Sequence, residues 1–172
     1  HRMSTVYMPG HKITMLPDAV VQTYTLQEGR DCPALSLYVT LDETTLTFTA
    51  STTRVERVPI VANLRHDQLD SIVTEQWLAQ PHAASAMDDS ALLPELRVQL
   101  SFLHRLALQL KSQRETVRGK PESFSRPDYN FRLLGKAADV PDGSEQVQIT
   151  VRQRGAPLDL IVAEAMILAN ST

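Results

Sequence analysis

The sequence predicts an α+β fold, and two kinds of periodicity support this prediction. Several stretches rich in β-branched and aromatic residues alternate between apolar and polar positions, which is typical of half-buried strands. Other stretches repeat their apolar residues every three or four positions, which is typical of amphipathic helices. Because strands, long helices, further strands and a last helix follow one another along the chain, α+β is favoured over a doubly wound sheet.

The chain opens with a turn and a short helix. Residues 1–17 contain a polar start, the turn Met8-Pro9-Gly10 and an apolar hook at 13–17. A Pro-Gly pair favours a turn with a positive φ at the glycine. The next residues, 18–26, are expected to form a helix with Asp18 in its first turn.

Three strands are predicted next, over residues 34–41, 45–51 and 54–62. In the first, leucines and a valine alternate with serine, tyrosine and threonine. Asp42-Glu43-Thr44 supplies a tight connection to the second strand. The sequence therefore predicts a three-stranded meander.

Helical spacing follows from residue 66. One helix is predicted over 66–78, then a loop over 80–89, and a long helix over 90–118 that Gly119 and Pro121 end. Two further strands, 129–134 and 146–153, are separated by a turn at Val140-Pro141-Asp142-Gly143, and residues 157–170 form the last predicted helix.

Composition limits the class of protein. The chain has 172 residues, 42% hydrophobic and 22% charged, which fits one globular domain or part of one. It contains no apolar run of the roughly 18–20 residues that cross a bilayer, and no signal peptide. The single Cys32 fits a reducing, cytoplasmic environment. With a net charge of −3, any contact with RNA must be local.

Three stretches together resemble one family. The first is RMSTVYMPG at Arg2–Gly10, followed by ITMLP at Ile13–Pro17. It is similar to a motif with an arginine, a T-x-Y-x-P-G turn and an M-L-P hook. The others are RPDYNF at Arg126–Phe131 and IVAEAMILAN at Ile161–Asn170. In this order they resemble the RNB domain of ribonucleases II and R.

The resemblance implies that residues 1–172 are a central segment of the catalytic domain, part of an RNB-type β-barrel or sheet surrounded by helices. The family's upstream D-x(5)-D-x-D-D cluster and downstream S-P-I-R motif do not occur in this sequence. The implied parent is a monomeric enzyme that hydrolyses single-stranded RNA from its 3′ end with Mg²⁺ and releases nucleoside monophosphates. These residues alone are then expected to be inactive. The alternatives are a noncatalytic RNB-like module that binds RNA or protein, and a purely structural interaction domain.

Two candidate RNA-contact residues have clear structural alternatives. Tyr7 matches the family tyrosine that stacks on the 3′-terminal nucleotide, and stacking on a base tolerates any sequence. Without the family, a tyrosine beside a Pro-Gly turn is more often a packing residue. Glu164 lies in the family-like helix, and the resemblance makes it a candidate to contact the ribose or support the wall of the site. A buried structural glutamate is the equal alternative.

Phe124 and Arg126 complete the candidate set. Phe124 is a candidate second face of a base sandwich, or else a core or loop anchor. Arg126 is a candidate phosphate contact, as are Arg132, Arg152 and Arg154, because guanidinium groups match phosphate geometry. Scattered arginines are more often solvated surface. The pair Asp88–Asp89 is interpreted as a helix cap rather than a metal site.

Overall fold

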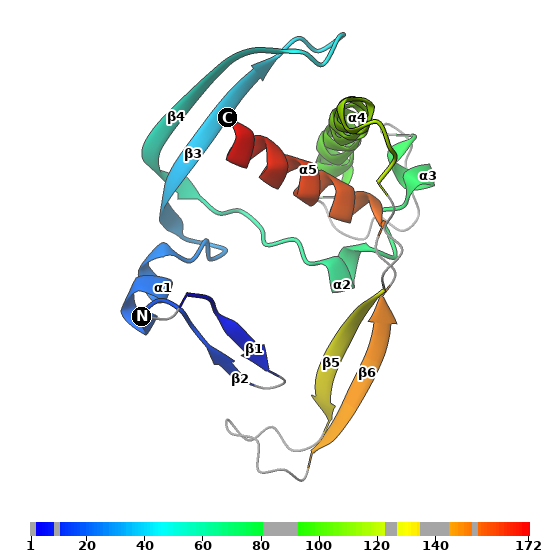
Figure 1. The fold of residues 1–172 in the computed structure, drawn as a ribbon. Helices are drawn as coiled ribbons and strands as arrows, with labels where there is room; N and C mark the ends of the chain where they lie inside the picture. The colour runs from blue at the N-terminus through cyan, green and yellow to red at the C-terminus, as the bar shows by residue number, and fades with distance from the viewer. Residues whose placement is uncertain (1–2, 9–10, 81–92, 123–126, 135–144, 153–154) are drawn as a thin grey trace. The chain divides into compact units, whose positions relative to one another are not determined.

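The computed structural model confirms the α+β class (Figure 1). It describes residues 3–8, 11–80, 93–122, 127–134, 145–152 and 155–172. In these ranges the strands pair two by two, as β1 with β2, β3 with β4 and β5 with β6, and no sheet closes into a barrel. The chain divides into two compact units, which are described separately. Unit 1 comprises residues 1–34, 56–62 and 125–154, and unit 2 comprises residues 35–55, 63–124 and 155–172.

Unit 1 begins with a small hairpin that the sequence did not predict. The strand β1 (Val6–Met8) pairs antiparallel with β2 (His11–Ile13). Three residues are too few to show an alternating pattern, which explains why these strands were missed. The hairpin is joined to the chain that follows it, because the backbone N–H of Met15 donates to Oγ1 of Thr5 at 3.2 Å. The predicted helix follows as α1 (Asp18–Tyr24).

A second hairpin of unit 1 has one polar and one apolar face. The strands β5 (Asp128–Leu134) and β6 (Gln146–Arg152), which the alternation predicted, pair antiparallel. Directly opposite residues share a face of a sheet. One face therefore carries three apolar pairs, Tyr129 with Val151, Phe131 with Ile149 and Leu133 with Val147. Most of these side chains are exposed in the described part of the chain.

The predicted three-stranded meander is wrong, because the second and third strands are one. The strands β3 (Asp31–Leu41) and β4 (Phe48–Pro59) form a single long hairpin. The break was expected at Thr52-Thr53, but these β-branched residues fit a strand and carry no turn signal. At the open end of the hairpin, Gly29 N–H donates to Ile60 C=O at 2.8 Å.

The turn between β3 and β4 is organised by Asp42. Its Oδ1 accepts from the backbone N–H of Thr44 at 3.0 Å, the backbone N–H of Thr45 at 2.7 Å and the Thr45 hydroxyl at 2.9 Å. Leu46 closes the turn with a φ of 54°, a left-handed conformation that costs a leucine energy. Its side chain is only 5% exposed, so burial offsets this cost.

Asp42 should make stability depend on pH in acid. The backbone N–H of Thr45 contributes most to holding the pKa of Asp42 below its ordinary value, and the Thr45 hydroxyl and Thr44 N–H act in the same direction. The resulting stability is fully present above the unfolded pKa, about 3.9. It is lost as the pH falls through the lower folded pKa.

We therefore expect Asp42→Asn to lower the melting temperature at pH 7 and to have little effect in strong acid. Asparagine keeps the turn acceptor but has no charge to lose. Circular dichroism melts of both proteins between pH 7 and 2 would measure the difference in melting temperature at each pH. The other carboxylates are present in both proteins, so their contributions cancel in this difference. A difference that stays constant with pH would contradict the role given to the carboxylate.

Unit 2 contains most of the helical structure. One helix was predicted over 66–78, but the structure has two short ones, α2 (His66–Leu69) and α3 (Glu75–Leu78). The β-branched run Ile72-Val73-Thr74 has low helix propensity. Thr74 is extended, and its hydroxyl accepts from the Trp77 N–H at 3.2 Å, so that it begins a new helix as an N-cap.

The long helix and the last helix are confirmed as α4 (Leu93–Arg118) and α5 (Pro157–Ser171). Together with α2 and α3 they enclose the hydrophobic core, made of Leu69, Val73, Trp77, Leu78, Leu100, Ala107, Leu158 and Ile161. Arg97 is buried against Trp77, donating from Nε to the Trp77 carbonyl at 2.9 Å with its guanidinium 4.7 Å from the ring centroid. None of the described helices is both long and apolar enough to span a membrane.

Candidate RNA-contact residues

Tyr7 is the central residue of β1, and its side chain is exposed to solvent. Its side chain is 80% exposed, so the described part of the chain gives it little packing. In the hairpin register Tyr7 lies directly opposite Lys12 on β2, and directly opposite residues share a face. An exposed aromatic ring and an exposed ammonium group therefore lie side by side on one face of the hairpin.

This pair can make both contacts that a sequence-tolerant RNA site needs. The tyrosine ring offers a stacking surface to any base, and the lysine offers a charge to a phosphate. Lys12 was not among the residues picked out from the sequence. Counting outward across a two-residue Pro9-Gly10 loop pairs Met8 with His11 and Tyr7 with Lys12, as observed, so the signal was present in the spacing.

Glu164 lies in a different environment, on α5 in unit 2. Its side chain is 3% exposed, and Oε1 accepts from Nη2 of Arg114 at 2.5 Å. Arg114 lies on α4 and also donates to Oε2 of Glu122 at 2.6 Å. The arginine thus joins α4, α5 and the chain that follows α4. This geometry supports the structural alternative for Glu164, and its predicted ribose contact stays a prediction.

The charges of this cluster reinforce one another. The hydrogen bond to Glu122, followed by that to Glu164, raises the pKa of Arg114 above its ordinary range, so the guanidinium stays charged. The hydrogen bond from Arg114 lowers the pKa of Glu122, with smaller contributions from Arg118 and Lys111. Burial acts against both shifts but is outweighed. Arg114 is therefore a permanent cation held between two carboxylates.

The other candidates are only partly described. Phe124, Arg126 and Arg154 lie outside the described residues, as does the pair Asp88–Asp89. Arg152 ends β6, but its side chain is not described. Arg132 is exposed on the polar face of β5. Tyr7 belongs to unit 1 and Glu164 to unit 2.

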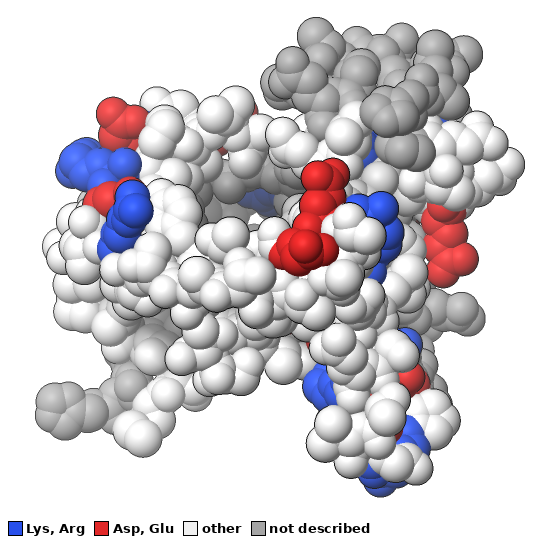
Figure 2. Space-filling view, turned by 90° about the horizontal axis from the view of Figure 1, so that it is seen from above, with Lys and Arg blue, Asp and Glu red and all other residues white. Residues whose placement is uncertain are grey.

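Two features bear on how RNA and metal ions would be held. On the face drawn in Figure 2, Lys and Arg side chains are scattered among acidic and uncharged ones. Among the residues that the structure describes, no group of three or more His, Cys, Asp or Glu side chains is placed to hold a metal ion. The described residues therefore do not form a complete magnesium site.

Comparison with known families decides the assignment. A model of the RNB domain matches residues 1–172, the whole of the sequence. The chain belongs to the RNB domain family. The resemblance found in the three sequence motifs is therefore confirmed. No curated protein and no solved structure matches the chain. RNB domains are exoribonuclease hydrolases, so membership indicates a ribonuclease or RNA-binding function for this RNB chain.

Proposed function

We propose that this chain is a central segment of an RNB catalytic domain that trims single-stranded RNA hydrolytically from the 3′ end and releases nucleoside monophosphates. Within it, the β1–β2 hairpin provides a base-stacking contact, and the β-hairpins contribute to a larger RNB-type sheet or barrel. The observation that carries this role is the exposure of Tyr7 beside Lys12. A packing tyrosine would be covered, whereas 80% of this side chain is open to a ligand.

The chemistry of the pair agrees with an exonuclease that acts on any sequence. Every base has a π-face, so stacking on Tyr7 does not select one base. A net charge of −3 provides no global attraction for RNA, which makes a local cation such as Lys12 important. We further propose that the parent enzyme is monomeric and cytoplasmic, and that its magnesium ligands lie outside residues 1–172. Arg114 and Glu164 then hold α4 and α5 together within unit 2 rather than contacting RNA.

Tyr7→Ala in the complete protein tests the proposal. We expect the affinity for a single-stranded oligoribonucleotide to fall by roughly 5- to 150-fold, because stacking on an aromatic ring contributes about 1–3 kcal/mol per base. Stability should change by less than about 0.5 kcal/mol, since the ring is exposed. Fluorescence anisotropy measures binding, gel analysis of a 5′-labelled RNA measures trimming with magnesium, and thermal melts measure stability.

Matched variants make the outcome specific. Tyr7→Phe keeps the ring and should keep most of the affinity, while Lys12→Ala should weaken binding and reduce its dependence on salt. Tyr24→Ala removes another exposed tyrosine of unit 1 and should leave binding unchanged. If Tyr7→Ala lost stability and affinity together, Tyr7 would be a packing residue. RNA binding without any trimming would instead identify a noncatalytic RNB module.

A further inference from the structure

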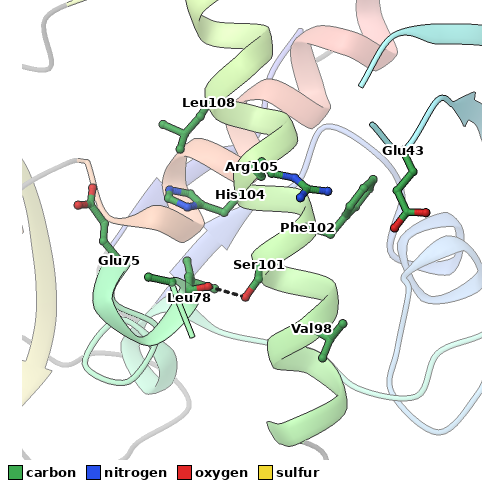
Figure 3. A pocket seen from close by; sticks show the side chains of 10 residues that line it. Glu43, Glu75, Leu78, Val98, Ser101, Phe102, His104, Arg105 and Leu108 are labelled. Carbon is green, nitrogen blue, oxygen red and sulfur yellow. Dashed lines mark hydrogen bonds between the residues drawn. The ribbon is translucent and has the colours of Figure 1, made fainter. Parts of the chain in front are cut away.

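A groove of about 750 Å³ lies along the exposed side of α4 (Figure 3). Its floor contains the α4 side chains Val98, Phe102 and Leu108. One wall is α3 with Glu75 and Leu78, and the other is the β3–β4 turn with Glu43. All of these residues belong to unit 2, so the groove lies within a single unit.

Both walls are fixed to α4 by hydrogen bonds. The Ser101 hydroxyl donates to the Leu78 carbonyl at 2.9 Å and holds the end of α3 against the helix. On the other side, Nε2 of Gln109 donates to the Thr45 carbonyl at 2.8 Å and holds the turn that carries Glu43. The groove is therefore formed before any ligand arrives, which reduces the ordering cost of binding.

The floor leaves apolar surface uncovered. Val98 and Leu108 are both more than 40% exposed, although they lie on the same helix as buried core residues. Their separation of ten residues corresponds to about 15 Å along a helix. Val98 and Phe102 lie on one flank of α4 and Leu108 on the other, with Ser101 and Arg105 between them. Exposed apolar side chains spread over this length are a surface that an amphipathic helix can cover with side chains at i, i+3, i+4 and i+7.

The charges around this apolar surface determine whether a basic or an acidic helix can bind it. Glu43 and Glu75 are exposed on the two walls, and neither forms an ion pair with a lysine or arginine of the described residues. Arg105 is the one described cation among the lining side chains, and its guanidinium lies 5.5 Å from the ring centroid of Phe102. Burial lowers the pKa of His104 although Glu75 opposes this, which disfavours a positive charge on the imidazole.

We propose that this groove docks a basic amphipathic helix of a protein partner. Leucine-like side chains of that helix cover Val98, Phe102 and Leu108, and its lysines or arginines reach Glu43 and Glu75 on the walls. The excess of negative charge disfavours a nucleic acid, whose phosphates would face two unpaired carboxylates. The residues that line the groove belong to unit 2, whereas Tyr7 belongs to unit 1.

Two labelled peptides of about 18 residues, or five helical turns, test the proposal on the complete protein. One is an amphipathic helix of leucine and lysine, and the other has glutamate in place of lysine. Fluorescence anisotropy should show binding of the lysine peptide and little binding of the glutamate peptide. The double variant Glu43→Lys/Glu75→Lys should weaken the lysine peptide about tenfold and strengthen the glutamate peptide.

Two controls distinguish binding in the groove from non-specific electrostatic attraction to the protein. Asp18→Lys/Asp31→Lys makes the same change in net charge on exposed residues of unit 1 and should leave both affinities nearly unchanged. Leu108→Ser, which alters no charge, should weaken the lysine peptide about fivefold, because it removes apolar contact. Thermal melts of each variant confirm that the fold is retained.

Three outcomes would overturn the docking proposal. The first is failure of both peptides to bind, and the second is an equal effect of the unit 1 control. The third is displacement of the lysine peptide by single-stranded RNA in wild-type protein, with tighter RNA binding by Glu43→Lys/Glu75→Lys, which would make the groove a nucleic-acid surface. None of these results depends on trimming activity or on Tyr7→Ala, so failure here is distinguishable from failure of the ribonuclease proposal.

Discussion

Trp77→Ala is expected to destabilise the protein by about 3–5 kcal/mol, the usual cost of removing a large buried aromatic side chain. Trp77 is 8% exposed and lies in the core between α3 and α4. Its loss would also deprive the buried Arg97 guanidinium of the ring it lies against. Urea unfolding followed by far-ultraviolet circular dichroism measures the change, since the variant lacks the chain's single tryptophan.

Trp77→Phe is the matched control. Nε1 of Trp77 has no hydrogen-bond partner among the described residues, so phenylalanine gives up area but no hydrogen bond. It also keeps an aromatic face for Arg97. We expect a loss of about 1–2 kcal/mol. If phenylalanine cost as much as alanine, the indole N–H would be making an important contact, and the account of this core as mainly apolar packing would fail.

The second large effect is expected at Arg114. Arg114→Met leaves the Glu164 carboxylate, 3% exposed, without its cation. Removing only one partner of a buried ion pair destabilises a protein by more than the intact pair stabilises it, because the remaining charge is buried without a partner. We expect a loss of about 3 kcal/mol in the free energy of unfolding at neutral pH. Urea unfolding curves of the wild-type protein and the variant measure it.

Removing the carboxylate instead of the arginine should destabilise the protein less. Glu164→Leu leaves Arg114 bound to Glu122 and 20% exposed, so the expected loss is about 1 kcal/mol. The double variant Arg114→Met/Glu164→Leu should recover most of the stability lost in Arg114→Met, since it removes both charges. Lys111→Met, one turn earlier on α4 and paired with Glu115 at 3.9 Å, should cost under about 0.5 kcal/mol. A double variant as unstable as Arg114→Met would show that packing of the arginine stem matters more than its charge.

The predictions made from sequence succeeded where a pattern was long. Both α4 and α5 have many apolar residues at helical spacing, and β5 and β6 alternate over seven residues each. Shorter signals failed for local reasons. The strands β1 and β2 have three residues each, and Thr74 begins a new helix instead of continuing the preceding one.

The candidate site was predictable to the extent that it is local. Tyr7 was found from its motif, whereas Lys12 was missed, although its place opposite Tyr7 follows from counting outward from the predicted Pro9-Gly10 turn. The partner of Glu164 was not predictable, because Arg114 is 50 positions away in the sequence and the contact exists only once α4 and α5 pack. The exposure that separates a stacking tyrosine from a packing one is likewise a property of the folded chain.

The apolar face of the β5–β6 hairpin affects how the protein behaves in solution. A two-stranded ribbon is marginal by itself in water, and here its three apolar pairs are stacked on one side. Burying that side away from water is favourable, so any segment that packs against it also stabilises the hairpin. The two faces of this hairpin therefore have different effects on folding. Its polar side can remain in contact with water, whereas its apolar side favours folding of this segment together with whatever packs against it.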